Sequence, residues 1–196
     1  MKKKEKGKEK TDIKKPKDDD IPINEFKIIF LGDAGVGAKT TLINRIMGEK
    51  FNEDEHTTST CSFTQKHVDI GNNEELILDL WDTIGQEEYR RLVIIFLNNI
   101  DCVVLGYDVT NKFSFEAIKD YWYPKIKELN LCNLIYLIGN QIDLVDKREV
   151  SKEEAIKYAE SVNLRFFEIS CKTKEGLNIF YNDLVNQILE LYIAKT

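Results

Sequence analysis

A glycine-rich segment carries the clearest chemical pattern in the sequence. Residues 32–40 read GDAGVGAKT and connect a short apolar run to a stretch with helical character. Backbone N–H groups in such a turn, together with the positive end of the following helix, can bind phosphate oxygens. Lys39 would then contact the outer phosphates, and Thr40 would give its hydroxyl to Mg²⁺. A purely structural turn between a strand and a helix is the alternative, but the sequence context favours phosphate binding.

The loop departs from the usual spacing of a phosphate-binding motif, GxxxxGK[ST]. It contains one residue too many between Gly32 and Lys39, and Ala38 stands where a glycine normally precedes the lysine. A Cβ at a position that needs a positive φ costs about 1 to 2 kcal/mol. We therefore expect weaker nucleotide binding than a standard loop provides.

Three later segments also place polar residues directly after apolar runs. They are Asp82-Thr-Ile-Gly85 followed by Gln86, Asn140-Gln-Ile-Asp143, and Ser170-Cys-Lys172. The apolar runs at 26–31, 76–81, 102–107, 134–139 and 166–170 have the length and composition of buried parallel strands. Ligands of open α/β sheets bind at the carboxyl ends of their strands. All four polar loops are therefore expected at one edge of a sheet.

Helical patterns alternate with these strands. We expect helices over 40–48, 87–98, 114–129 with a kink at Pro124, 155–162 after a capping box at Ser151 and Glu154, and a last helix striped by apolar residues at 177–191. A further β-type stretch at 59–69 precedes the turn GNNEE and should pair antiparallel with 76–81. The prediction is an α/β fold: a mostly parallel six-stranded sheet with one antiparallel edge strand and helices on both faces.

Composition indicates a single domain preceded by a charged extension. The chain has 196 residues and a net charge of -6, but its first 20 residues hold nine lysines and six acids. Residues 1–25 contain too few apolar side chains to offset the entropy of ordering, so we predict a disordered extension and a domain over 26–196. The acidic body favours no nucleic-acid partner. The four cysteines form no CxxC pair and there are two histidines, so we expect neither zinc nor a disulfide framework.

Taken in order, the four loops resemble the motifs of Ras-superfamily small GTPases over about residues 26–193. The stretches 76–92 (LILDLWDTIGQEEYRRL) and 105–115 (LGYDVTNKFSF) are most similar to Rab proteins. The resemblance implies a small G domain that binds GTP and GDP with Mg²⁺, hydrolyses GTP slowly and acts as a molecular switch, in vesicle trafficking for the Rab branch. It also implies effector, exchange-factor and GTPase-activating proteins as partners.

The resemblance also assigns roles to individual residues. Gln86 would orient the attacking water, Lys39 would stabilise developing charge, and Asp143 would accept both guanine donors, N1–H and N2–H₂. The implied magnesium residues are Thr40, Thr58 and Asp82. The implied nucleotide contacts are Gly35, Val36, Gly37, Ala38, Lys39, Thr40, Thr41, Phe51, Thr58, Gly85, Asn140, Gln141, Asp143, Ser170, Cys171 and Lys172.

Several positions depart from the family pattern. Gln141 replaces a lysine, Ile84 replaces an alanine, and residues 58–63 and 96–100 differ from the Rab pattern, so specific partners do not carry over. Arg90 and Arg91 are expected on a solvated helix face rather than as a catalytic arginine supplied in cis.

Other expectations concern location and alternative functions. No cysteine follows Cys171 and Lys2 follows Met1, so we expect no direct lipid anchor, a cytoplasmic monomer, and membrane contact only through a partner. One alternative is an interaction module that keeps the fold but binds nucleotide poorly. A phosphate-loop kinase is disfavoured because it has no use for the segment 140–143.

Overall fold

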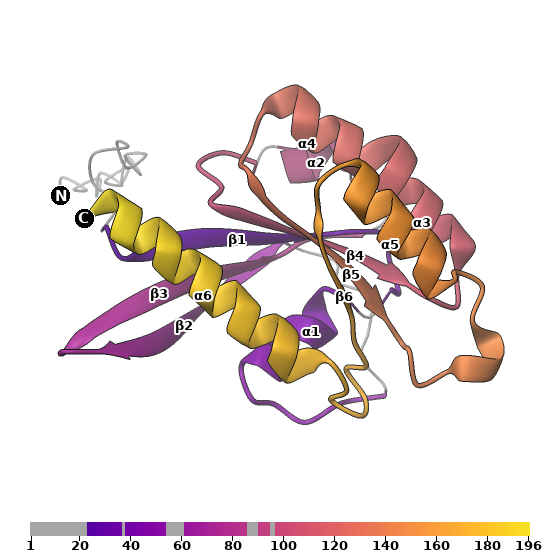
Figure 1. Cartoon of the computed structure of the whole chain (residues 1–196), viewed down its shortest axis with the longest axis horizontal. Coiled ribbons are helices and arrows are strands. Elements are labelled where there is room, and N and C mark those ends of the chain that lie inside the picture. The colour runs from indigo at the N-terminus through magenta and orange to yellow at the C-terminus, as the bar shows by residue number, and fades with distance from the viewer. Residues whose placement is uncertain (1–22, 37, 54–60, 86–89, 95–96) are drawn as a thin grey trace, which may run out of the picture.

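A six-stranded sheet with the strand order β2-β3-β1-β4-β5-β6 forms the centre of the domain (Figure 1). The computed structural model describes residues 23–36, 38–53, 61–85, 90–94 and 97–196. The strands are β1 (Glu25–Leu31), β2 (Ser62–Gly71), β3 (Glu74–Asp82), β4 (Cys102–Asp108), β5 (Leu134–Asn140) and β6 (Arg165–Glu168). Strands β2 and β3 pair antiparallel, and the other neighbouring pairs are parallel. The predicted fold class is therefore confirmed.

Helices cover both faces of this sheet (Figure 1). They are α1 (Thr40–Ile46), α2 (Arg90–Val93), α3 (Lys112–Ala117), α4 (Tyr123–Leu129), α5 (Lys152–Ser161) and α6 (Leu177–Lys195), with a π-helical turn η4 (Ile118–Trp122) and a 3₁₀ turn η5 (Val145–Lys147). In the described part of the chain, none of these helices is long and apolar enough to cross a membrane.

The helix predicted over 114–129 with a kink at Pro124 consists of α3, η4 and α4 in direct succession. The N–H of Tyr123 donates to the carbonyl of Ile118, five residues earlier, which is the hydrogen bond of a π-helix. Proline has no N–H and its ring clashes with the carbonyl four residues earlier in a regular α-helix. The wider turn immediately before Pro124 lets the helix continue past it.

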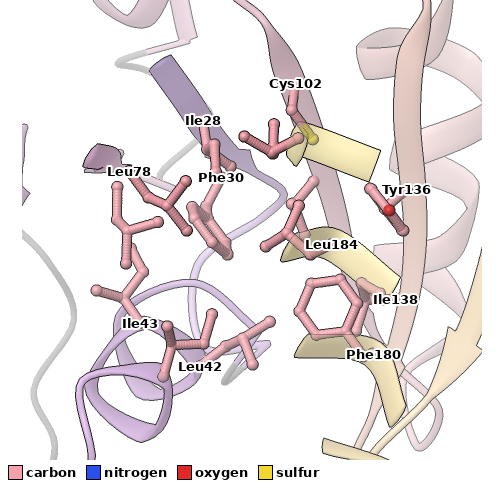
Figure 2. Packing of buried hydrophobic residues seen from close by; sticks show 14 of the residues in the cluster. Ile28, Phe30, Leu42, Ile43, Leu78, Cys102, Tyr136, Ile138, Phe180 and Leu184 are labelled. Atoms are coloured by element: carbon pink, nitrogen blue, oxygen red, sulfur yellow. The ribbon is translucent and has the colours of Figure 1, made fainter. Parts of the chain in front are cut away.

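The alternating residues of β1 divide the core into two parts. Phe26, Ile28 and Phe30 point to the face covered by α1 and α6, and Ile29 and Leu31 point to the other face. On the first face, Figure 2 shows side chains from the sheet, α1 and α6 meeting in one cluster. The labelled members include Ile28, Phe30, Leu78, Leu42, Ile43, Phe180 and Leu184. Each such side chain contributes roughly 1.5 to 3 kcal/mol when fully buried.

The second face is covered by the α3-η4-α4 helix and by α5. Phe115, Trp122 and Ile126 are fully buried there against Leu105 and Leu137 of the sheet. The two clusters hold the central strands from both sides, and this fixes where the loops after the strands begin.

Several predicted elements differ from the structure in their boundaries, and two of them bear on the loops of the sheet edge and the hairpin. The strand predicted over 59–69 begins at Ser62 and continues to Gly71, and Asn72 and Asn73 both have a positive φ in the turn that follows. Consecutive left-handed residues make the type of tight turn that matches the twist of an antiparallel hairpin. Of the helix predicted over 87–98, the structure describes α2 at Arg90–Val93. The predicted N-terminal extension lies outside the described residues up to position 22.

Candidate functional site

The loops after β1, β3, β5 and β6 meet at the carboxyl edge of the sheet. The parallel register of β1 and β3 places Phe30 opposite Asp82. Immediately beyond this pair, the hydroxyl of Thr83 donates to the carbonyl of Phe30 at 2.6 Å. Thr83 is fully buried, so this bond joins the starts of two loops that the sequence predicts to act together.

Lys39 lies inside the glycine-rich loop rather than on its surface. Its side chain is buried, and Nζ donates to the carbonyl of Asp33 at 2.5 Å, across the loop. Burial lowers the pKa of the Lys39 ammonium to about 8, against the opposing effect of the Asp82 and Asp33 carboxylates. A buried cation at this position would be stabilised by an anion such as a phosphate, because opposite charge favours the charged form.

Thr40 and Asp82 form a pair suited to a divalent cation. The Thr40 hydroxyl, at the first residue of α1, donates to Oδ2 of Asp82 at 2.7 Å. A hydroxyl and a carboxylate are the hard oxygen ligands that Mg²⁺ binds alongside water and phosphate oxygens. Among the described residues, no three His, Cys, Asp or Glu side chains gather into a metal cluster. The hydroxyl of Thr40 and the carboxylate of Asp82 fit two of the oxygen ligands of a magnesium ion.

The segment after β3 packs directly on the glycine-rich loop. A Cβ added to Gly85 would lie 2.5 Å from the backbone nitrogen of Ala34 and 2.6 Å from Lys39 Nζ. Only glycine allows the two segments to approach so closely. Gly37, Thr58 and Gln86, which the sequence assigns to nucleotide, magnesium and water, lie outside the described residues.

Asn140 connects three loops. Its Nδ2 donates to the carbonyl of Val36 at 3.4 Å, and its Oδ1 accepts the backbone N–H of Cys171 at 3.1 Å. Nearby, the hydroxyl of Ser170 donates to Oδ1 of Asp143 at 2.6 Å. The motifs 140–143 and 170–172 are thereby joined to each other and to the glycine-rich loop.

A cavity of about 280 Å³ opens between these loops. It is lined by Thr41, Phe51, Asn52, Glu53, Asn140, Gln141, Asp143, Leu144, Cys171 and Lys172. This volume is just below the roughly 300 to 1,000 Å³ of typical ligand pockets. It suits one planar heterocycle, whose attached groups would extend along the glycine-rich loop.

Two cavity residues have contacts that the sequence did not indicate. Gln141 has a φ of 70°, and its Nε2 donates to Oδ2 of Asp108 at 2.8 Å, at the end of β4. Lys172 forms an ion pair with Glu53 at 2.6 Å, and its Nζ lies 6.0 Å from the centre of the Phe51 ring. Phe51 and Lys172 therefore lie on the same wall of the cavity.

The expectation that Arg90 lies on a solvated helix face is wrong. Its guanidinium forms an ion pair with Oδ1 of Asp33 at 2.7 Å, and its side chain is 12% exposed. It also lies over the ring of Tyr121 at 4.5 Å, and the indole of Trp122 donates to the same Asp33 oxygen at 3.4 Å. Sequence patterns gave no sign of this cluster, because its members come from three segments that are far apart in the sequence.

The architecture is that of a phosphate-loop nucleotide-binding domain: an α/β sheet whose glycine-rich loop, lysine, threonine and carboxylate meet at the strand ends. The chain belongs to the Ras family, whose family model matches residues 27–190. This confirms the sequence-based identification of a Ras-superfamily small GTPase.

Similarity to individual relatives points to the Rab branch. The chain is 36% identical to Ras-related protein Rab-21 of Mus musculus over 168 residues, which cover 84% of this chain and 73% of the relative. It is 36% identical to Ras-related protein Rab-13 of Canis lupus familiaris over 165 residues, covering 84% and 80%. It is 34% identical to GTP-binding protein ypt5 of Schizosaccharomyces pombe over 169 residues, covering 86% and 79%.

Proposed function

We propose that this chain is a Rab-like GTPase that binds GTP and GDP with Mg²⁺ and hydrolyses GTP slowly. The observation that carries the proposal is the position of Asn140, which is bonded both to the glycine-rich loop at Val36 and to the 170–172 loop at Cys171. A buried amide that joins a phosphate-type loop to a cavity of base size gives one site for both ends of a nucleotide.

Guanine is the base that the cavity chemistry favours. A carboxylate at Asp143 can accept from N1–H and N2–H₂ of guanine, and adenine has no such pair of donors. Ser170 holds one oxygen of this carboxylate at 2.6 Å, which fixes the orientation of the group. The resemblance to small GTPases also implies that the N–H of Cys171 meets guanine O6, and in the structure this N–H donates to Oδ1 of Asn140. In the complex, guanine O6 and Oδ1 of Asn140 would share the N–H of Cys171.

The phosphate end rests on Lys39, Thr40 and Asp82. The ammonium of Lys39 would bind the outer phosphates, and the oxygens of Thr40 and Asp82 would lie on the metal and its water shell. Mg²⁺, when bound with the nucleotide, supplies positive charge to the phosphate oxygens. Gln86, the residue after Gly85, would orient the hydrolytic water.

The regulatory part of the proposal concerns the loops around the γ-phosphate. The order of residues 51–63 and 82–98 would depend on the γ-phosphate and Mg²⁺, so that partners recognise the GTP state. Effectors, exchange factors and GTPase-activating proteins are the expected partners. Vesicle trafficking is the expected setting, with the protein in the cytoplasm and any contact with membranes peripheral.

The first test is to identify what the protein carries. The chain is purified without added nucleotide and denatured, and the released compounds are separated by ion-exchange chromatography. Near-stoichiometric GDP or GTP supports the proposal. A site that is empty and also fails to take up fluorescent GDP with Mg²⁺ contradicts it, and the protein is then an interaction module that keeps the fold.

The second test separates hydrolysis from binding. Gln86→Leu should lose stimulated GTP hydrolysis while its dissociation constant for GDP stays within about twofold of the natural protein, because the glutamine acts on water rather than on the nucleotide. Unchanged turnover in this variant would remove Gln86 from the mechanism.

A further inference from the structure

A single glycine interrupts the most deeply buried strand of the sheet. Every residue of β4 is buried, and Gly106 stands between the large apolar side chains of Leu105 and Tyr107. Glycine weakens a strand interior, because it adds backbone entropy to the unfolded chain and packs no side chain. Such a glycine often marks a place where another part of the backbone comes very close.

The segment that comes close to Gly106 is the glycine-rich loop. A Cβ added at position 106 would lie less than 3.0 Å from the Cβ of Ala38 and 3.1 Å from its carbonyl oxygen. Ala38 itself is fully buried. At the other end of the loop, a Cβ added to Gly32, whose φ is 147°, would lie less than 3.0 Å from the carbonyl oxygen of Gly106. Gly106 therefore contacts both the start of the loop and the residue before Lys39.

This packing explains how the loop accommodates its additional residue. Lys39 still reaches across to Asp33, and Thr40 still reaches Asp82. The methyl group of Ala38 lies in the space beside β4 that a side chain at position 106 would otherwise fill. The space at position 106 thus holds the methyl group of Ala38 in a loop in which Lys39 contacts Asp33 and Thr40 contacts Asp82.

We propose that Gly106 is a positioning residue for nucleotide binding, because its missing side chain makes room for Ala38 and so keeps Lys39 and Thr40 in place. Positions 38 and 106 form a steric pair in which one member at most carries a Cβ. The inference rests on the proposed function, since its main measurement is the affinity for guanine nucleotide.

The test moves the methyl group from one member of the pair to the other. Gly106→Ala should raise the dissociation constant for fluorescent GDP with Mg²⁺ at least tenfold. Adding Ala38→Gly to this variant should bring the constant back to within about threefold of the natural protein, since neighbours that share a space are not additive. Loss of affinity without rescue would overturn the proposal, and so would a Gly106→Ala variant that binds as the natural protein does.

A second comparison places a larger side chain at position 106 in two loops, the natural one and one of standard length. Deletion of Ala38 restores the spacing GxxxxGKT. Gly106→Val should abolish nucleotide binding in the natural loop and be tolerated in the shortened one. Equal losses in the two loops would contradict the steric pairing.

Gly139 in β5 provides the matched control. A Cβ added there would lie 2.7 Å from the hydroxyl oxygen of Tyr107, so Gly139→Ala strains the same sheet through a different contact. Ala38→Gly should not rescue it. If the natural protein binds no guanine nucleotide, the proposed function fails, and the steric pairing is then tested by thermal unfolding. An unfolding midpoint that Gly106→Ala lowers and Ala38→Gly restores still supports the pairing. A lowered midpoint that Ala38→Gly does not restore overturns it.

Discussion

The ammonium group of Lys39 occupies a buried position where its charge has few partners from the protein itself. Its hydrogen bond goes to a backbone carbonyl, that of Asp33, and burial holds its pKa at about 8. An unperturbed lysine titrates near pH 10.4. The folded protein therefore releases this proton between about pH 8 and 10, whereas the unfolded chain keeps it.

This difference predicts a pH dependence of nucleotide affinity. Phosphates stabilise the charged form of Lys39. At high pH, nucleotide binding therefore requires that Lys39 takes up a proton from the solvent. The dissociation constant for GDP should rise about tenfold between pH 7 and pH 9, because one pH unit above the pKa costs a factor of ten. Lys39→Arg should bind more weakly, with a constant that hardly varies over this range, since arginine stays charged. Titrations with fluorescent GDP measure both, and a flat profile in the natural protein would contradict the assignment.

Motif spacing was sufficient to predict that Lys39, Thr40, Asp82 and Asn140 lie together at the strand ends, and the structure brings them together there. The contact between Ala38 and Gly106 could not be found in this way. It joins segments far apart in the sequence, and neither residue has a chemical group that marks it. The available signals were the unusual Ala38 in the loop and a glycine in an otherwise bulky strand, and nothing in the sequence connects them.

A helical turn depends on contacts outside itself, because helix nucleation is unfavourable, and the structure describes α2 over Arg90–Val93. Arg90 at its start is bonded to Asp33 in the glycine-rich loop and stacks on Tyr121 of η4. A pair whose side chains are 12% and 27% exposed should contribute more than a solvent-exposed one. A double-mutant cycle of Arg90→Ala and Asp33→Ala should give a coupling free energy of about 1 kcal/mol in urea unfolding. Additive effects of the two changes would mean that the ion pair does not hold α2.

The helix α5 depends on a cap that the sequence predicts directly. Ser151 accepts the backbone N–H of Glu154 at 3.1 Å, as the capping pattern requires. Replacing Ser151 with alanine should lower the free energy of unfolding by about 1 kcal/mol, because a helix-end donor loses its partner. Ser151→Asn keeps an acceptor and should cost much less. Equal losses in the two variants, measured by urea unfolding, would exclude the cap as the cause.

The strands were predictable as elements because buried parallel strands are short apolar runs with polar residues at their ends. The π-turn before Pro124 was not predictable, since a kink and a wider turn satisfy the proline equally well in the sequence. The end of β2 also differs from the prediction, because the hairpin turn at Asn72 and Asn73 extends the pairing of β2 with β3 to Gly71.

Across the whole molecule, stability and binding occupy different parts of the fold. The two apolar clusters lie on the faces of the sheet, and the candidate site lies at the carboxyl ends of the strands. The loops of the site are joined to one another mainly through hydrogen bonds such as those of Asn140. A ligand that bridges these loops would therefore stabilise the molecule as a whole.

Nucleotide should accordingly raise the thermal unfolding midpoint, and the base should decide by how much. GDP at a hundred times its dissociation constant adds about 2.7 kcal/mol, which corresponds to about 5 to 11 °C for a domain of this size. ADP at the same concentration brings the same phosphates to Lys39 and Thr40, but it has no donor pair for Asp143, so its shift should be much smaller. Asp143→Ala should bring the GDP shift down to that of ADP without changing the ADP shift. Equal shifts by GDP and ADP in the natural protein would contradict guanine recognition, and no shift by either, with Mg²⁺ present, would contradict nucleotide binding itself.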